Sequence, residues 1–181
     1  MNTRIIMAAI AGIISLSGLA LESGSEYKYD FEQSAEGVLP KGYRQIKDRW
    51  CGGTFEIIDD ECGGLKKALK IVKPDEKKTI RILMDRRPRI RIKTGDRVIL
   101  EFSVKAAGRI SAGYYAFAPG EVKSEYNAAY AAVKTGEWQK IKMELTVKKP
   151  DMAELSPFFQ SHTPGAVFSG LKVTIIPKEK P

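Results

Sequence analysis

The sequence is poor in the residues that most often bind metals or perform catalysis. Its 181 residues include one histidine, His162, and two cysteines. A structural zinc site normally takes four cysteine or histidine ligands, so this composition argues against one. No Ser-His-Asp order and no phosphate-binding glycine loop is present. Asp59, Asp60 and Glu61 are consecutive, which predicts a solvated hairpin loop rather than the two opposed carboxylates of a glycoside hydrolase.

These absences favour a non-catalytic protein, with one enzymatic alternative. A polysaccharide lyase needs a base and a cation that stabilises the enolate. His162 or a tyrosine could act with Arg89, although His162 lies in a Ser-His-Thr-Pro-Gly turn and no motif surrounds it.

The N-terminus has the three regions of a secretory signal. Residues 1–4 are short and basic, residues 5–16 are apolar apart from Gly12 and Ser15, and Gly18-Leu19-Ala20 places small residues at the positions that signal peptidase reads. We expect residues 1–20 to be a signal peptide cleaved after Ala20. An uncleaved anchor is the alternative, because the apolar run is near the lower limit of about 17 residues for spanning a bilayer. Without a cysteine at the junction, a lipid anchor is disfavoured, and export predicts a secreted, periplasmic or cell-surface protein.

The remaining residues, 21–181, fit one domain. Their two cysteines, Cys51 and Cys62, are eleven positions apart. In an oxidising compartment this pair predicts a disulfide, worth about 3 kcal/mol by the loop-entropy estimate.

Acidic residues are in the minority: 30 Lys and Arg against 22 Asp and Glu give a formal charge of +8. Arg4 is the only charged residue of the signal, so the rest of the chain carries +7. Such a surface favours anionic polymers. Candidate partners are uronate-rich or sulfated polysaccharides, envelope phosphates and membrane surfaces, whereas export argues against nucleic acid.

The apolar runs after the signal are short and alternate with period two, which is typical of strands. In residues 97–106, Val98, Leu100, Phe102, Val104 and Ala106 share one face. Residues 140–147 repeat the pattern, and we expect further strands at 54–58, 68–72, 79–84, 89–93, 109–118, 154–160 and 167–176. Residues 124–133 fit either a helical turn or a strand. The sequence therefore predicts an all-β, antiparallel sandwich or barrel.

Several segments, taken in order, resemble carbohydrate-binding modules of the galactose-binding-like jelly-roll group, of the CenC type. The segments are Tyr29-Asp30-Phe31-Glu32 as an opening strand, Leu39-Pro40-Lys41-Gly42-Tyr43, Gly63-Gly64-Leu65, residues 97–105, Thr135-Gly136-Glu137-Trp138 and Gly165-Ala166-Val167-Phe168. The resemblance implies a β-jelly-roll that binds a polysaccharide without catalysis. It also implies a structural role for Trp138, which is out of phase with its strand and so requires either a bulge or an outward ring.

The resemblance raises the question of calcium. Relatives hold it through the opening-strand Glu and paired aspartates of the last strand, but Ser169 and Gly170 occupy the latter place here. Asp30 and Glu32 therefore either bind calcium or cap the first strand with hydrogen bonds.

Sugars stack their C–H faces on aromatic rings while polar groups bind the hydroxyls. Tyr115 shares a strand face with Arg109, Ser111, Gly113 and Phe117, a mixture typical of a partly solvated face. The candidate carbohydrate-binding residues are Trp50, Tyr115, Tyr126, Tyr130, Arg89 and Arg91.

Each of these candidates has a structural alternative. For the aromatic residues it is packing in the core or at its rim. Arg89, Arg91 and Lys93 alternate along one strand face, and this row of cations suits either an anionic glycan or an edge strand protected from aggregation.

The leading hypothesis is a secreted carbohydrate-binding module, possessing no cofactor other than the calcium considered above. The alternative is a structural or adhesive envelope protein that uses the same sandwich for protein contacts. The sequence leaves the oligomeric state undetermined.

Overall fold

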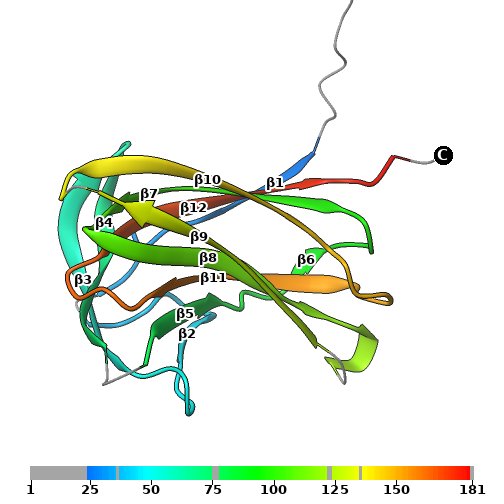
Figure 1. Ribbon diagram of the computed structural model, residues 1–181, viewed down its shortest axis with the longest axis horizontal. Coiled ribbons are helices and arrows are strands. Elements are labelled where there is room, and N and C mark those ends of the chain that lie inside the picture. The colour runs from blue at the N-terminus through cyan, green and yellow to red at the C-terminus, as the bar shows by residue number, and fades with distance from the viewer. Residues whose placement is uncertain (1–23, 36, 75–77, 122–123, 135, 180–181) are drawn as a thin grey trace, which may run out of the picture.

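The computed structural model describes residues 24–179 except 36, 75–77, 122–123 and 135. The expected signal peptide, residues 1–20, lies outside the described residues. Two antiparallel sheets pack against each other, with sheet A above sheet B in Figure 1. The described residues include no helix that is long and apolar enough to cross a membrane.

Each sheet has six strands. Sheet A runs in the order β10 (Trp138–Thr146), β7 (Arg97–Lys105), β12 (Val167–Ile176), β4 (Leu65–Pro74) and β3 (Gly53–Cys62), with β1 (Ser25–Tyr29) also paired to β12. Sheet B runs in the order β2 (Tyr43–Ile46), β5 (Ile80–Met84), β11 (Glu154–Ser161), β8 (Gly108–Phe117) and β9 (Ser124–Val133), with β6 (Ile90–Arg91) also paired to β11. A short 3-10 turn, η1 (Pro119–Glu121), follows β8.

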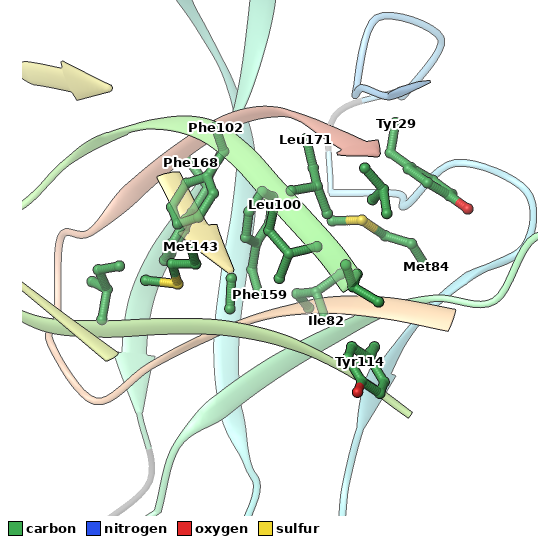
Figure 2. Packing of buried hydrophobic residues seen from close by; sticks show 14 of the residues in the cluster. Tyr29, Ile82, Met84, Leu100, Phe102, Tyr114, Met143, Phe159, Phe168 and Leu171 are labelled. Atoms are coloured by element: carbon green, nitrogen blue, oxygen red, sulfur yellow. The ribbon is translucent and has the colours of Figure 1, made fainter. Parts of the chain in front are cut away.

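The core lies between the sheets and is built from the alternating apolar positions of the strands. Phe102 from β7 contacts Phe159 from β11 with ring centres 5.0 Å apart, and Phe159 stacks on Phe168 from β12 at 4.7 Å. Figure 2 shows these rings with Leu100 and Leu171 beside them. Val98, Leu100, Phe102 and Val104 are all buried, so the face expected from the period-two pattern is confirmed.

The structure decides two local alternatives, at residues 124–133 and Trp138, and corrects two expectations, for the opening strand and the strand at 89–93. Residues 124–133 form a strand, and the opening strand ends at Tyr29 rather than beginning there. The strand expected at 89–93 is reduced to the two residues of β6, which follow Pro88. Trp138 faces outward from sheet A, where its Nε1 donates to Asp60 Oδ1 at 3.3 Å.

The expected disulfide between Cys51 and Cys62 is wrong; both cysteines are free. Asp59, Asp60 and Glu61 were expected to form a loop between them, but they continue β3, and the turn lies at Gly63 and Gly64. An extended strand rises about 3.3 Å per residue, which separates the cysteines by roughly 30 Å. A disulfide needs Cα atoms within about 7 Å.

The environments of the two thiols predict different reactivity. Cys51 is 1% exposed and lies 3.5 Å from the Thr79 hydroxyl, and burial raises the pKa of its thiol. Cys62 is partly exposed.

A maleimide reagent should therefore label one site in the native protein and two after unfolding, as counted by intact mass, and Cys62→Ser should abolish native labelling. Complete resistance of the unfolded protein to labelling, or a Tm that falls on adding dithiothreitol, would contradict the free thiols.

Candidate functional site

The outer face of sheet B, which points away from the core, gathers most of the aromatic side chains that are accessible to solvent. Among the described residues the exposed aromatic side chains are Trp50 (63%), Tyr126 (43%) and Tyr130 (49%). Tyr126 and Tyr130 lie on the same side of β9, and their partners in β8 are Tyr115 and Ser111. Three of the four predicted aromatic residues, Tyr115, Tyr126 and Tyr130, therefore lie together.

A buried arginine organises this face. Arg81 Nε donates to Gln160 Oε1 at 2.7 Å, and Arg81 Nη1 donates to the Tyr115 hydroxyl. The guanidinium carbon is 4.7 Å from the centre of the Tyr126 ring and 5.2 Å from that of Phe158. The Tyr126 hydroxyl shares the same acceptor, Gln160 Oε1, at 3.2 Å. We call these five residues the Arg81 cluster.

The rings of the Arg81 cluster pack over a glycine. Phe158 pairs with Gly113 across the β11–β8 ladder, and a Cβ on Gly113 would lie 2.8 Å from the Phe158 ring. The absence of a side chain lets the ring settle on the sheet, where Tyr126 stacks on it with centres 5.3 Å apart and planes 10° from parallel. Burial raises the pKa of Tyr126 to about 12, so its phenol remains a hydrogen-bond donor at neutral pH.

A second arginine, Arg89, lies on the same face, near the start of β11. Arg89 Nε donates to Asp85 Oδ1 at 2.6 Å and its Nη2 to Asp85 Oδ2 at 3.1 Å. Its guanidinium carbon lies 3.8 Å from the centre of the Phe117 ring. The Ser156 hydroxyl also donates to Asp85 at 2.8 Å, and Arg44 approaches it at 3.7 Å. Hydrogen bonding from Arg89 is the main cause that lowers the pKa of Asp85.

The expected row of exposed cations at Arg89, Arg91 and Lys93 is therefore not formed as such. Arg89 is 5% exposed and paired with Asp85, whereas Arg91 and Lys93 are exposed. Arg91 lies opposite Glu154 at one end of β11. Trp50 lies towards the other end, because its carbonyl accepts from Thr79 N just before β5. Arg91 and Trp50 thus lie towards opposite ends of β11, with Tyr115 paired to the strand between them.

Several residues of this face are not among the binding residues predicted from the sequence. Arg109 lies 4.1 Å from the centre of the Tyr130 ring, and Gln160 and Phe158 come from β11, which supplied none of the predicted binding residues. The alternation of Ser156, Phe158 and Gln160 with the core residues Leu155 and Phe159 was the available signal. That alternation identifies binding-face residues only once β11 is known to be the central strand of sheet B.

The structure does not bring the suggested lyase pair together. His162 is exposed just after β11, whereas Arg89 lies near Glu154 at the start of that strand. Seven residues of extended chain separate the two ends by roughly 20 Å.

Comparison with solved structures identifies the architecture. The chain is similar to the xylan-binding CBM22-1 domain of Paenibacillus barcinonensis Xyn10C, with TM-score 0.55, 10% identity and coverage of 88% of this chain and 100% of that one. It is also similar to the family 11 carbohydrate-binding module of Clostridium thermocellum, with TM-score 0.50, 11% identity and coverage of 86% and 98%. The chain has the β-jelly-roll fold of carbohydrate-binding modules. No family model and no curated protein matches the sequence.

A third similar structure is larger than this chain. It contains the CBM22-1 and GH10 modules of Clostridium thermocellum xylanase 10B, complexed with xylohexaose, and has TM-score 0.53 at 12% identity. The match covers 88% of this chain and 29% of that one. At these identities the likeness establishes the fold of the module, and the finer CenC-type assignment stays a prediction.

The residues considered for calcium in this module are engaged elsewhere. Glu32 Oε1 accepts from the backbone N–H groups of Lys66 and Lys67, both at 2.8 Å, and Asp30 Oδ1 accepts from Glu32 N at 3.1 Å. The Lys67 ammonium donates to the Ser34 carbonyl, so a positive charge already lies beside this loop. The described residues bring no three His, Cys, Asp or Glu side chains together.

The replacement of the expected aspartates also has a steric cause. A Cβ on Gly170 would lie 2.5 Å from Leu65 Cδ1 and 3.0 Å from the Tyr29 carbonyl oxygen. An aspartate at this position would collide with both. We propose that Asp30 and Glu32 act as hydrogen-bond acceptors rather than as calcium ligands.

We predict that the stability of the module is independent of calcium. The Tm measured by calorimetry should be the same in 1–5 mM EDTA and in the same concentration of CaCl₂, because Lys67 already contributes a cation on the Ser34 carbonyl. Lys67→Met should lower the Tm in both buffers. A rise in Tm that saturates with calcium in the unmodified protein would show that a metal binds here.

The lowered pKa of Asp85 predicts that the free energy of unfolding depends on pH. A carboxyl whose pKa is lowered in the folded state stabilises that state above its unfolded pKa of about 3.9, and the contribution is lost as the pH falls through the folded value. Asp85→Asn removes the bidentate carboxylate partner of the buried Arg89, which then keeps Glu154 at 3.9 Å, and should cost about 3 kcal/mol at pH 7. Urea unfolding from pH 7 to pH 2 should show the curves of the two proteins converging in acid; a constant difference would contradict this role.

Proposed function

We propose that this chain is an exported, non-catalytic module that binds an anionic polysaccharide along the outer face of sheet B. The observation that carries the proposal is the pair of exposed rings, Tyr126 and Tyr130, set beside the guanidinium groups of Arg81 and Arg109. Apolar sugar faces stack on such rings, and the adjacent donors bind hydroxyl or carboxylate oxygens.

The two arginines have different parts in this proposal. Arg81 is 9% exposed and holds Tyr115 and Tyr126 in place, so it is a positioning residue. Arg109 is exposed and lies against Tyr130, where it can reach a ligand that stacks on the ring. The exposed Arg44 and Arg91 add positive charge to the same face.

The similar structures support a carbohydrate ligand in kind. One is a xylan-binding domain, one is complexed with xylohexaose and one with a mixed-linked tetrasaccharide. The preference for an anionic polymer rests on the charge of +7 that the chain carries without its signal and on its exposed arginines. Export to the cell surface, the periplasm or the medium rests on the N-terminal signal and would place the module among envelope and extracellular glycans.

Removing the two exposed rings should weaken glycan binding. We expect Tyr126→Ala with Tyr130→Ala to raise the Kd for polygalacturonate oligosaccharides at least tenfold, which is about 1.4 kcal/mol, because the stacking surface is lost. Calorimetry in 0.15 M salt measures this while screening non-specific attraction.

Tyr126→Phe with Tyr130→Phe is the matched control, because it keeps the rings and should retain most of the affinity. Equal Kd values for the alanine and phenylalanine proteins would contradict the proposed site. A protein that binds no glycan, neutral or acidic, but forms a stable oligomer or co-purifies with a protein partner would favour the adhesive alternative.

A further inference from the structure

A large hollow opens at the edge of the sandwich, beside β1 and β2. Its volume is about 790 Å³, and its walls are the end of β1, the segment that leads into β2 and the loop that follows β5. Its charged lining residues are Lys28, Lys41, Arg86, Arg87, Asp30 and Asp85. Four cations from three separate segments therefore converge on one concave surface.

The acidic residues of the hollow are already paired. Asp85 accepts from Arg89 and Ser156, and Asp30 Oδ1 accepts from the backbone of Glu32. Among the described residues no carboxylate lies within ion-pair distance of Lys28, Lys41 or Arg86. The net field inside the hollow is positive, and the self-repulsion of these cations is relieved by an anion.

The wall around Arg86 is held in place by close packing. Gly42 has φ +85°, and a Cβ there would lie 3.1 Å from the Cα of Arg86, so glycine lets the start of β2 approach the loop after β5. Tyr29 and Tyr43 pack beside each other with ring centres 6.1 Å apart, and the positive charge of Arg86 acts on both phenols. Tyr43 also lines the hollow.

The geometry points to a second binding site in this hollow, for an oxyanion group such as a carboxylate or a sulfate ester carried by the glycan. Guanidinium and ammonium groups bind such oxygens through charge-assisted hydrogen bonds, and a planar guanidinium can bind two oxygens at once. The oxyanion site rests on the hollow alone, whereas a glycan as the carrier rests on the proposed function.

The hollow and the exposed tyrosines lie close enough for one polymer to reach both. Asp85 lines the hollow and accepts from Ser156, which is paired with Tyr115 across the β11–β8 ladder. Neighbouring strands are about 4.8 Å apart, so Asp85 lies only about two strand spacings from Tyr115. A polysaccharide bound at both places gains from the high effective concentration of its second contact.

The test uses small anions that need no aromatic platform. In ¹⁵N NMR titrations at constant ionic strength, sodium sulfate and sodium galacturonate should each give saturable shifts at the amides of Lys41, Gly42 and Arg86. Their relative affinities distinguish a sulfate from a carboxylate site. Lys41→Gln with Arg86→Gln should weaken the binding at least fivefold. Shifts that grow linearly without saturation for both anions would overturn the inference.

Two further variants distinguish binding in this hollow from non-specific charge attraction and from binding at the exposed tyrosines. Lys140→Gln with Lys142→Gln removes the same charge from a neighbouring hollow of about 500 Å³ on the outer face of sheet A, which shares Lys28 and Asp30 with this one but not Lys41 or Arg86. It should leave anion binding unchanged, and an equal loss there would overturn the inference. Tyr126→Ala with Tyr130→Ala should also retain the anion shifts. The glycan-binding proposal can therefore fail while the oxyanion site is supported, and the oxyanion site can fail while glycan binding is supported.

Discussion

The outer face of sheet B depends on the burial of one guanidinium group. A buried charge is costly unless its donors are satisfied, and Arg81 satisfies them with Gln160 and Tyr115 while lying against the rings of Tyr126 and Phe158. These partners come from β11, β8 and β9, so a side chain from β5 fixes the surface of four strands. Phe158 is fully buried on a face that points away from the core. The face therefore has its own small apolar layer and keeps its shape without a ligand.

Asp85 organises the other end of the same face, around the second buried arginine, Arg89. It neutralises Arg89, which covers Phe117, and it accepts from Ser156 in the central strand β11. The same carboxylate forms part of the wall of the hollow beside β1. One acidic residue thus sets the boundary between a face shaped by aromatic stacking and a hollow in which lysines and arginines outnumber carboxylates. Its depressed pKa keeps it ionised over the range in which both surfaces are positively charged.

The sequence predicted the strands well because alternation is a local property, and it predicted the site in part for the same reason. The mixture of Ser111, Gly113 and Tyr115 on one strand face marked the outer face of β8. It could not show that β9 and β11 would flank β8, so Gln160 and Phe158 were missed. The prediction of the disulfide was wrong for a related reason. Asp59, Asp60 and Glu61 have the composition of a turn, but β3 continues through them beside β4. The turn lies instead at Gly63 and Gly64, whose positive φ values favour glycine. Register depends on partners distant in sequence, which composition does not reveal.

The charge of the chain divides into two kinds with different consequences for binding. The alternation of Arg89, Arg91 and Lys93 suggested one row of exposed cations, but Arg89, like Arg81, is buried and lies against aromatic side chains. The cations that remain open to solvent, such as Arg109, Lys41 and Arg86, come from β8, from the segment before β2 and from the loop after β5. Their arrangement is a product of the fold rather than of local sequence. Selectivity for an anionic ligand must therefore arise from how the sandwich gathers these separate segments, and the net charge alone contributes only a screened, non-specific attraction.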